Sequence, residues 1–150
     1  MITIRAASPK EPEALALLAA SHALMQSLYS PEECHYLDVD QLCVPSITLF
    51  LAEEDGVTLG CGAIARKDGY AELKSMFTTP EARGKGVASL IVDQIEATAR
   101  GESIPVLRLE TGHVLHAAHR LYERHGFTLC GPFGSYKAVP ASIFYEKSLG

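Results

Sequence analysis

Residues 83 to 88 read Arg83-Gly84-Lys85-Gly86-Val87-Ala88, and they join a strand-like run at 71–78 to a helix-like run at 87–100. Two glycines one residue apart therefore stand where a strand passes into a helix. A helix N-terminus presents unpaired backbone N–H groups, which bind phosphate groups well. Glycine lets the backbone approach a ligand closely, and the two cations add favourable charge. The segment predicts a loop that binds a pyrophosphate.

Two other phosphate-binding motifs do not fit this segment. A Walker A loop ends in Gly-Lys-Ser/Thr, whereas Gly84 and Lys85 are followed by Gly86. The dinucleotide-binding fingerprint requires a third glycine, and Ser89 stands at that position. A pair of glycines is common in turns, so the specificity comes from the preceding strand, from Pro80 and from the amphipathic helix that follows.

The composition is that of one soluble globular domain, which we expect to span residues 1–150. No apolar run reaches the roughly 18 residues of a membrane span. The first five residues do not resemble a secretory signal, so we expect a cytoplasmic protein with no membrane partner. The net charge of −5 argues against a nucleic-acid-binding face and is compatible with a cationic or amine-bearing substrate. The cysteines lack metal-ligand spacing and are expected to be reduced thiols; they are Cys34, Cys43, Cys61 and Cys130.

The hydrophobic pattern predicts an alternation of strands and helices. The expected strands are 1–6, 47–52, 57–66, 70–78, 106–111, 127–130 and 143–147, and the expected helices are 13–29, 87–99 and 115–125. Short turns make the central strands an antiparallel meander, and strand-helix-strand after residue 70 implies a parallel pair. We therefore expect an α/β (α+β) fold, in which helices flank a mixed, mostly antiparallel sheet of six to seven strands.

Local features of the sequence carry further expectations. Gly60 and Gly62 indicate a bulge or a close approach of the backbone, and Gly101 is expected to cap the helix before it. Residues 31–46 are expected to form a loop or short helix near the substrate entrance. The first helix is expected to bury one stripe, formed by Leu15, Leu18, Ala19, His22 and Met25.

Two segments of the second half resemble the GNAT family of N-acetyltransferases. Residues 76–78, Pro80 and the loop at 83–86 resemble the main cofactor motif of the family. Leu121-Tyr122 followed by Gly126-Phe127 resembles its later motif at a helix end. This resemblance implies an acyl-CoA N-acyltransferase-like fold, with acetyl-CoA as co-substrate and no metal.

The resemblance also implies roles for individual residues. The backbone of Met76 and Thr78 would bind the pantetheine arm like an added strand, and the loop would hold the pyrophosphate. Tyr122 would protonate the departing CoA thiolate; a tyrosine of the hydrophobic core is the alternative. Many family members carry Asn at the position of Leu115, so that contact would be absent or pass to His116. The expected cofactor-binding residues are Met76, Phe77, Thr78, Arg83, Gly84, Lys85, Gly86, Val87, Ala88, Ser89, Thr111, His116 and Tyr122.

Transfer to an amine also requires a base that takes a proton from the acceptor. Glu72 is the first candidate, on a strand that would place Lys74 and Met76 on the same face. The alternative is a solvated carboxylate that only pairs with Lys74. Glu110, near the C-terminal end of the next strand, is the second candidate. The histidines at 113, 116 and 119 lack a carboxylate to complete a metal site.

These observations favour an acetyl-CoA-dependent N-acetyltransferase. Its acceptor is expected to be the primary amine of a small or amino-acid-like molecule, which attacks directly in a ternary complex. A protein or peptide acceptor is the second choice, and a non-catalytic acyl-CoA-binding sensor domain is the alternative of a different class. The acidic residues of segment 31–46 favour an amine-bearing acceptor or are simply solvated. No nucleic acid is expected, and the formation of a homodimer is left open.

Overall fold

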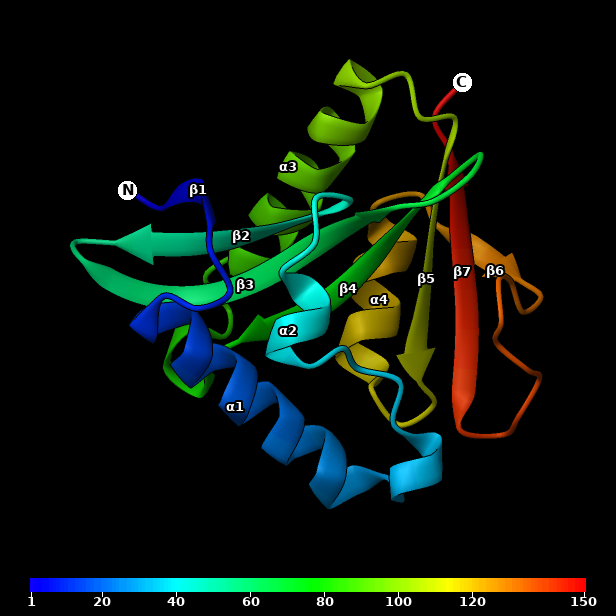
Figure 1. Ribbon diagram of the computed structural model, residues 1–150, viewed down its shortest axis with the longest axis horizontal. Coiled ribbons are helices and arrows are strands. Elements are labelled where there is room, and N and C mark those ends of the chain that lie inside the picture. The colour runs from blue at the N-terminus through cyan, green and yellow to red at the C-terminus, as the bar shows by residue number, and fades with distance from the viewer.

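Seven strands form one mixed sheet in the computed structural model, which describes residues 1–150 (Figure 1). The strands are β1 (Thr3–Ala7), β2 (Ile47–Glu54), β3 (Val57–Arg66), β4 (Ala71–Thr78), β5 (Val106–Gly112), β6 (Thr128–Cys130) and β7 (Ser142–Ser148). Their order in the sheet is β1-β2-β3-β4-β5-β7-β6. Only β4 and β5 are parallel neighbours, while all other neighbours are antiparallel. The predicted meander, the crossover and the mixed sheet are confirmed.

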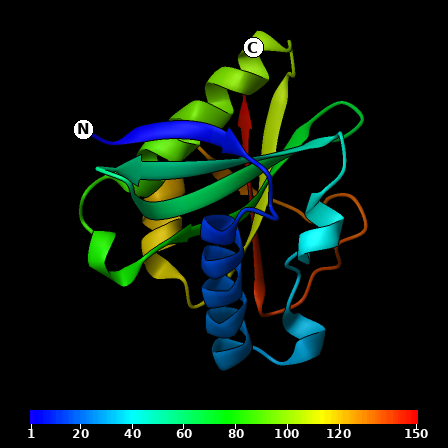
Figure 2. The same ribbon diagram turned by 60° about the vertical axis from the view of Figure 1, so that its left-hand side comes forward.

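Helices cover both faces of this sheet. They are α1 (Pro12–Leu28), α2 (Val39–Leu42), α3 (Val87–Gly101) and α4 (His116–Arg124), with short 3-10 turns at Pro31–Glu33 and Pro80–Ala82. The first two lie on one face, and α3 and α4 lie on the other (Figures 1 and 2). Alternate residues of β2 and β3 enter the two cores, because successive side chains of a strand point to opposite faces. No helix has the length and apolar character needed to cross a membrane.

Two expectations about the helices are wrong in detail. The buried stripe of α1 consists of Ala14, Leu17, Leu18 and Ser21, while Leu15 remains 42% exposed. Apolar residues occur on several sides of this helix, so periodicity alone does not select the face that meets the sheet. The expected cap Gly101 is instead the last residue of α3; Glu102 is the C-cap residue, and Ser103 after it takes the left-handed conformation, with φ of 59°.

β4 contains a bulge that interrupts its regular pairing with β3. Cys61 pairs with Phe77, but Ala63 pairs with Lys74, so β4 holds one extra residue opposite β3. Ser75 adopts a left-handed backbone conformation there, with φ of 57°. The bulge reverses the alternation, and Met76 therefore contacts the α3 side of the sheet. The expectation that Glu72, Lys74 and Met76 share one face is wrong for this reason.

The same region shows why β3 contains glycines. A Cβ atom on Gly60 would lie 2.7 Å from the Phe77 carbonyl oxygen, and one on Gly62 would lie 2.6 Å from Ile91. The predicted bulge and close approach are thus both confirmed. β4 also leaves β5 before the bulge, because these strands pair only at Ala71–Leu107 and at Glu72–Arg108.

Candidate active site

The loop before α3 presents a free helix N-terminus. Gly84 and Gly86 have φ values of 85° and 78°, a conformation that glycine adopts without steric cost. Gly86 is the N-cap residue of α3, and the first backbone hydrogen bond of the helix runs from Leu90 to Gly86. The N–H groups of the first turn therefore have no partner within the helix. No protein atom lies within 4 Å of a Cβ built on either glycine, so the outer side of the loop is open.

A hydrogen bond from the end of α4 orients one residue of this loop. Ser89 Oγ lies 2.8 Å from Nε2 of His125, and His125 Nδ1 lies 3.5 Å from Asp93 Oδ1. The pair joins the first turn of α3 to the residue that follows α4. Sequence analysis missed His125, because it belongs to no motif and is 36 residues away from Ser89.

A cavity of about 870 Å³, here called the long cavity, extends from this loop along β4 to α4. Twelve of the thirteen predicted cofactor-binding residues line it: Met76, Phe77, Thr78, Arg83, Gly84, Gly86, Val87, Ala88, Ser89, Thr111, His116 and Tyr122. Lys85 is exposed and does not line it. Ser75 also lines the long cavity, and its buried hydroxyl has no hydrogen-bond partner in the chain.

Tyr122 lies on α4 at the inner end of the long cavity. Its side chain is buried, with 5% exposure, and packs between the rings of Phe127 and Tyr145. Its hydroxyl makes no hydrogen bond within the chain. Burial, and then the negative charge of Glu110, raise the pKa of the Tyr122 phenol. The phenol therefore keeps its proton at neutral pH, as a general acid requires.

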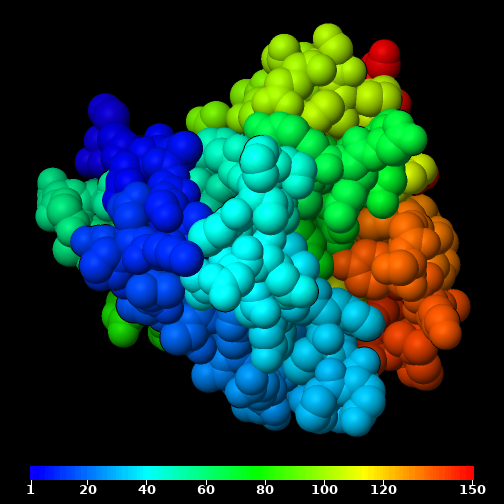
Figure 3. Space-filling model, viewed as in Figure 1, coloured from blue at the N-terminus to red at the C-terminus, as the bar shows by residue number.

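A second cavity of about 460 Å³, here called the outer cavity, lies on the face of the sheet that α1 and α2 cover. Segments 31–46 and 131–140 meet over this face (Figure 3), where the ring of His35 contacts the edge of Tyr136 at a centroid distance of 5.3 Å. His35 and Lys74 line both cavities, so the two cavities adjoin at these residues.

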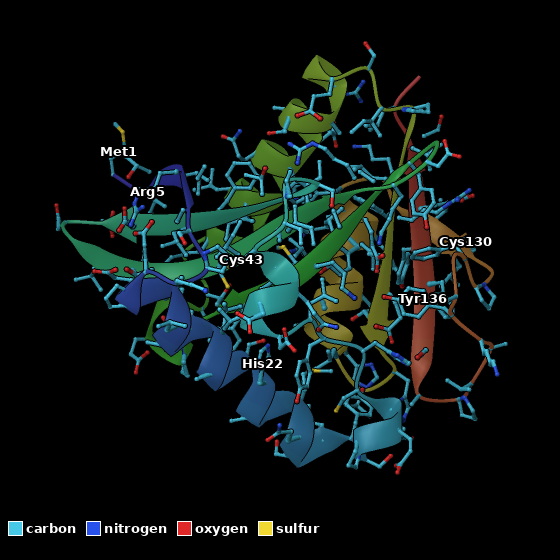
Figure 4. The ribbon with its side chains drawn as sticks, viewed as in Figure 1. Met1, Arg5, His22, Cys43, Cys130 and Tyr136 are labelled. Atoms are coloured by element: carbon cyan, nitrogen blue, oxygen red, sulfur yellow. The ribbon has the colours of Figure 1, made fainter.

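A buried polar cluster forms the wall of the outer cavity. Tyr136, labelled in Figure 4, donates a 2.5 Å hydrogen bond to Glu72 Oε2. Lys74 Nζ donates to the Tyr136 hydroxyl at 2.8 Å and to the His35 carbonyl at 2.9 Å, and it lies 3.4 Å from Glu72. Burial, followed by the charge of Glu72, raises the pKa of the Tyr136 phenol. The partnership of Glu72 with Lys74 is therefore present, but it is buried rather than solvated.

Glu110 lies on the same face of the sheet, and it also lines the long cavity. Ser142 donates a 2.8 Å hydrogen bond to its Oε2. Burial raises the pKa of the Glu110 carboxyl, and this effect exceeds the opposing effects of Ser142, His35 and Lys74. The two predicted base candidates thus differ: Glu72 is tied to a phenol and an ammonium group, while the carboxyl of Glu110 faces the long cavity.

The three histidines near α4 have separate surroundings. A ring nitrogen of His119 lies 2.9 Å from the Gly112 carbonyl oxygen, His116 contacts the ring of His119 edge-on, and His113 packs against Tyr29. No group of three His, Cys, Asp or Glu side chains is placed to bind a metal ion. All four cysteines are free thiols.

The fold is that of an acyl-CoA N-acyltransferase. Residues 17–127 match the Acetyltransferase (GNAT) family. The chain is 37% identical to the IAA acetyltransferase of Azospirillum brasilense over 99% of this chain and 98% of that protein. A Klebsiella pneumoniae structure described as an acyl-CoA N-acyltransferase is 34% identical and superposes with a TM-score of 0.88, covering 100% of this chain and 99% of that one.

A more distant structure shares the fold and holds the cofactor. It is a GNAT acetyltransferase from Elizabethkingia anophelis with acetyl-CoA bound, 19% identical, with a TM-score of 0.74 over 99% of this chain and 98% of that one. The chain described here belongs to the GNAT family and is an acetyl-CoA-dependent acetyltransferase.

Proposed function

We propose that this protein transfers the acetyl group of acetyl-CoA to the primary amine of a small molecule, by direct attack in a ternary complex. The observation that carries the proposal is that the two cavities adjoin, with His35 and Lys74 in the lining of both. Acetyl-CoA in the long cavity and an acceptor in the outer cavity would be held together at that point. Holding both reactants at once removes much of the entropic barrier and needs no acyl-enzyme.

The cofactor would follow the length of the long cavity. Its pyrophosphate would meet the N–H groups around Gly84 and Gly86, supported by Arg83. The separation of β4 from β5 leaves the backbone of residues 76–78 without a partner on that side. The pantetheine arm would pair there as an added strand, which brings the thioester toward Tyr122.

The chemical step requires three proton transfers. The acceptor ammonium first gives a proton to a base, and the neutral nitrogen then attacks the thioester carbonyl. The carbon–sulfur bond breaks, the departing thiolate takes the proton of Tyr122, and the second proton that the nitrogen loses as the amide forms restores the Tyr122 phenol. Glu72 and Glu110 are the two candidates for the base. The raised pKa of Glu110 favours it, because a base works best when its pKa is near the operating pH. Glu72 would then orient Lys74 and Tyr136.

The dimensions of the outer cavity favour a small acceptor over a protein. Its volume of about 460 Å³ suits a small ligand. The relative from Azospirillum brasilense, named for acetyl transfer to IAA, also supports a small-molecule acceptor.

The test is release of free CoA from acetyl-CoA over a library of primary amines, run beside alcohols and peptides. We expect release with a subset of small amines and formation of the corresponding amide. Tight binding of acetyl-CoA without any release would instead favour the sensor domain. Release only with alcohols would contradict N-acetylation, and release only with peptides would favour the protein acceptor.

A further inference from the structure

We propose that the acceptor amine also carries a carboxylate, which Lys67 and Lys137 bind at the outer end of the outer cavity. This inference rests on the proposed N-acetyltransferase function and specifies the class of its acceptor. Lys67 lies just after β3, at the hairpin that leads into β4, and Lys137 belongs to the 131–140 loop. Both lysines are exposed, and both line the outer cavity.

The pairing of cations across the molecule is the first argument. Of the 13 lysines and arginines, seven lie within 4.0 Å of a carboxylate: Arg5, Lys10, Arg66, Lys74, Arg100, Arg108 and Lys147. The six others are Lys67, Arg83, Lys85, Arg120, Arg124 and Lys137. Arg83 and Lys85 belong to the phosphate-binding loop, and Arg124 lines the long cavity. Arg120 is exposed on α4 and lines neither cavity. Five of the six unpaired cations therefore lie where anionic ligand groups are expected or at the outer cavity, and the two at the outer cavity are Lys67 and Lys137.

The charge of the outer cavity is the second argument. Lys74 and Glu72 neutralise each other as an ion pair at 3.4 Å, and the Lys74 ammonium donates two further hydrogen bonds, to the His35 carbonyl and the Tyr136 hydroxyl. Lys67 and Lys137 then outweigh the one further acidic residue in the lining, Glu32. The cavity is therefore positive in a chain of net charge −5. Such a local excess attracts an anionic group of the ligand.

The position along β4 assigns this anion to the acceptor rather than to the cofactor. Phosphate groups of acetyl-CoA belong at the loop after β4, next to Arg83. Lys67 lies beyond the opposite end of β4. A strand rises about 3.3 Å per residue, so Tyr70, which precedes β4 at the end away from the phosphate-binding loop, is about 13 Å from Lys74. The anion near Lys67 is consequently on the far side of the acceptor cavity from the cofactor, and a carboxylate is the anionic group that an amino-acid-like amine carries.

The test compares matched acceptors that differ only in this charge. The panel contains L-amino acids and glycyl dipeptides, each beside its C-terminal amide, and CoA release gives kcat and KM for each. The parent protein is expected to favour the free carboxylate of at least one pair by about tenfold or more in kcat/KM, because a charge-assisted contact is lost in the amide. In the double variant Lys67→Gln/Lys137→Gln, KM for that acid should rise until acid and amide are equivalent, with KM for acetyl-CoA unchanged.

Arg120→Gln is the matched control, because Arg120 is exposed on α4, has no carboxylate partner and lines neither cavity. It should leave the preference for acid over amide intact. Equal turnover of acids and amides by the parent, or an unchanged preference in the double variant, would overturn the carboxylate site while leaving N-acetylation standing. Failure to acetylate any amine would remove the proposed function, and the carboxylate site with it. A thermal melt shows whether the double variant, which changes only exposed side chains, is folded.

Discussion

Replacing Tyr122 with Phe removes one hydroxyl and leaves the ring that packs between Phe127 and Tyr145. If this phenol protonates the thiolate, kcat should fall by about a hundredfold or more, as for other general acids. That fall corresponds to at least about 2.7 kcal/mol of transition-state stabilisation. Acetyl-CoA affinity should change little, because only the transition state uses the proton.

The same substitution should have little effect on the stability of the folded state. The Tyr122 hydroxyl makes no hydrogen bond within the chain, so its removal leaves no buried partner unsatisfied. We expect a change in the free energy of unfolding of about 0.5 kcal/mol or less, which shifts Tm by roughly 2 °C at most. The loss of transition-state stabilisation calculated from kcat should therefore be several times larger than the change in the free energy of unfolding.

Tyr145→Phe provides the matched control. Tyr145 is equally buried, and its hydroxyl donates a 2.7 Å hydrogen bond to Glu123. Its removal should lower stability by about 0.5–1.5 kcal/mol and leave kcat near that of the parent. The assay is CoA release at saturating acceptor, combined with a thermal melt of each variant. A parental kcat in Tyr122→Phe would refute the assignment and shift attention to another donor such as His116.

Three further variants examine the loop, the strands and the base. Gly86→Val should weaken acetyl-CoA binding by tenfold or more. Its control is Gly56→Val, at a similar positive φ in a hairpin far from the loop, which should lower stability by about 1–2 kcal/mol, as Gly86→Val does, but leave acetyl-CoA affinity unchanged. Equal affinities of the two variants, measured by calorimetry, would contradict the loop assignment. Gly60→Ala should lose about 1–3 kcal/mol by pressing on the Phe77 carbonyl, while Gly101→Ala, in open space at a helix end, should be neutral or stabilising in denaturant unfolding. The pKa of Glu110 is raised in the folded state, so its stability contribution is fully present below about pH 4.3 and is lost as pH rises through the folded pKa. Glu110→Gln should therefore gain Tm relative to the parent as pH rises from about 4 to 8, and a pH-independent difference would argue against the buried charge.

Sequence reasoning succeeded where a feature is local. The two turns of the meander and the loop before α3 follow from residues that stand next to each other, such as Gly84 and Gly86, whose positive φ values only glycine adopts freely. The face of α1 that is buried could not be predicted in the same way. Its apolar residues lie on several sides, and the choice of Leu17 over Leu15 depends on the sheet against which the helix packs.

The polar wall of the outer cavity could not be read from the sequence at all. Glu72, Lys74, His35 and Tyr136 come from three segments of the chain that contact one another only after folding. Tyr136 stands in a Gly- and Pro-rich loop and belongs to no motif. The spacing of Glu72 and Lys74 along one strand predicted that the two side chains would pair. Their burial depends on segments 31–46 and 131–140, whose sequences show no helical or strand periodicity.

The path of β4 bears on how one strand would serve two ligands. β4 pairs with β5 only as far as Glu72, so the backbone edge at residues 76–78 has no strand partner on that side. The bulge at Ser75 then turns Met76 toward α3, while Lys74, before the bulge, still faces the outer cavity. In the proposed complex, side chains before the bulge would be available to an acceptor, and the backbone after it would be available to the cofactor. The proposed arrangement of acetyl-CoA and amine would therefore depend on the path of β4, and on the glycines of β3 that leave room for Met76 and Phe77.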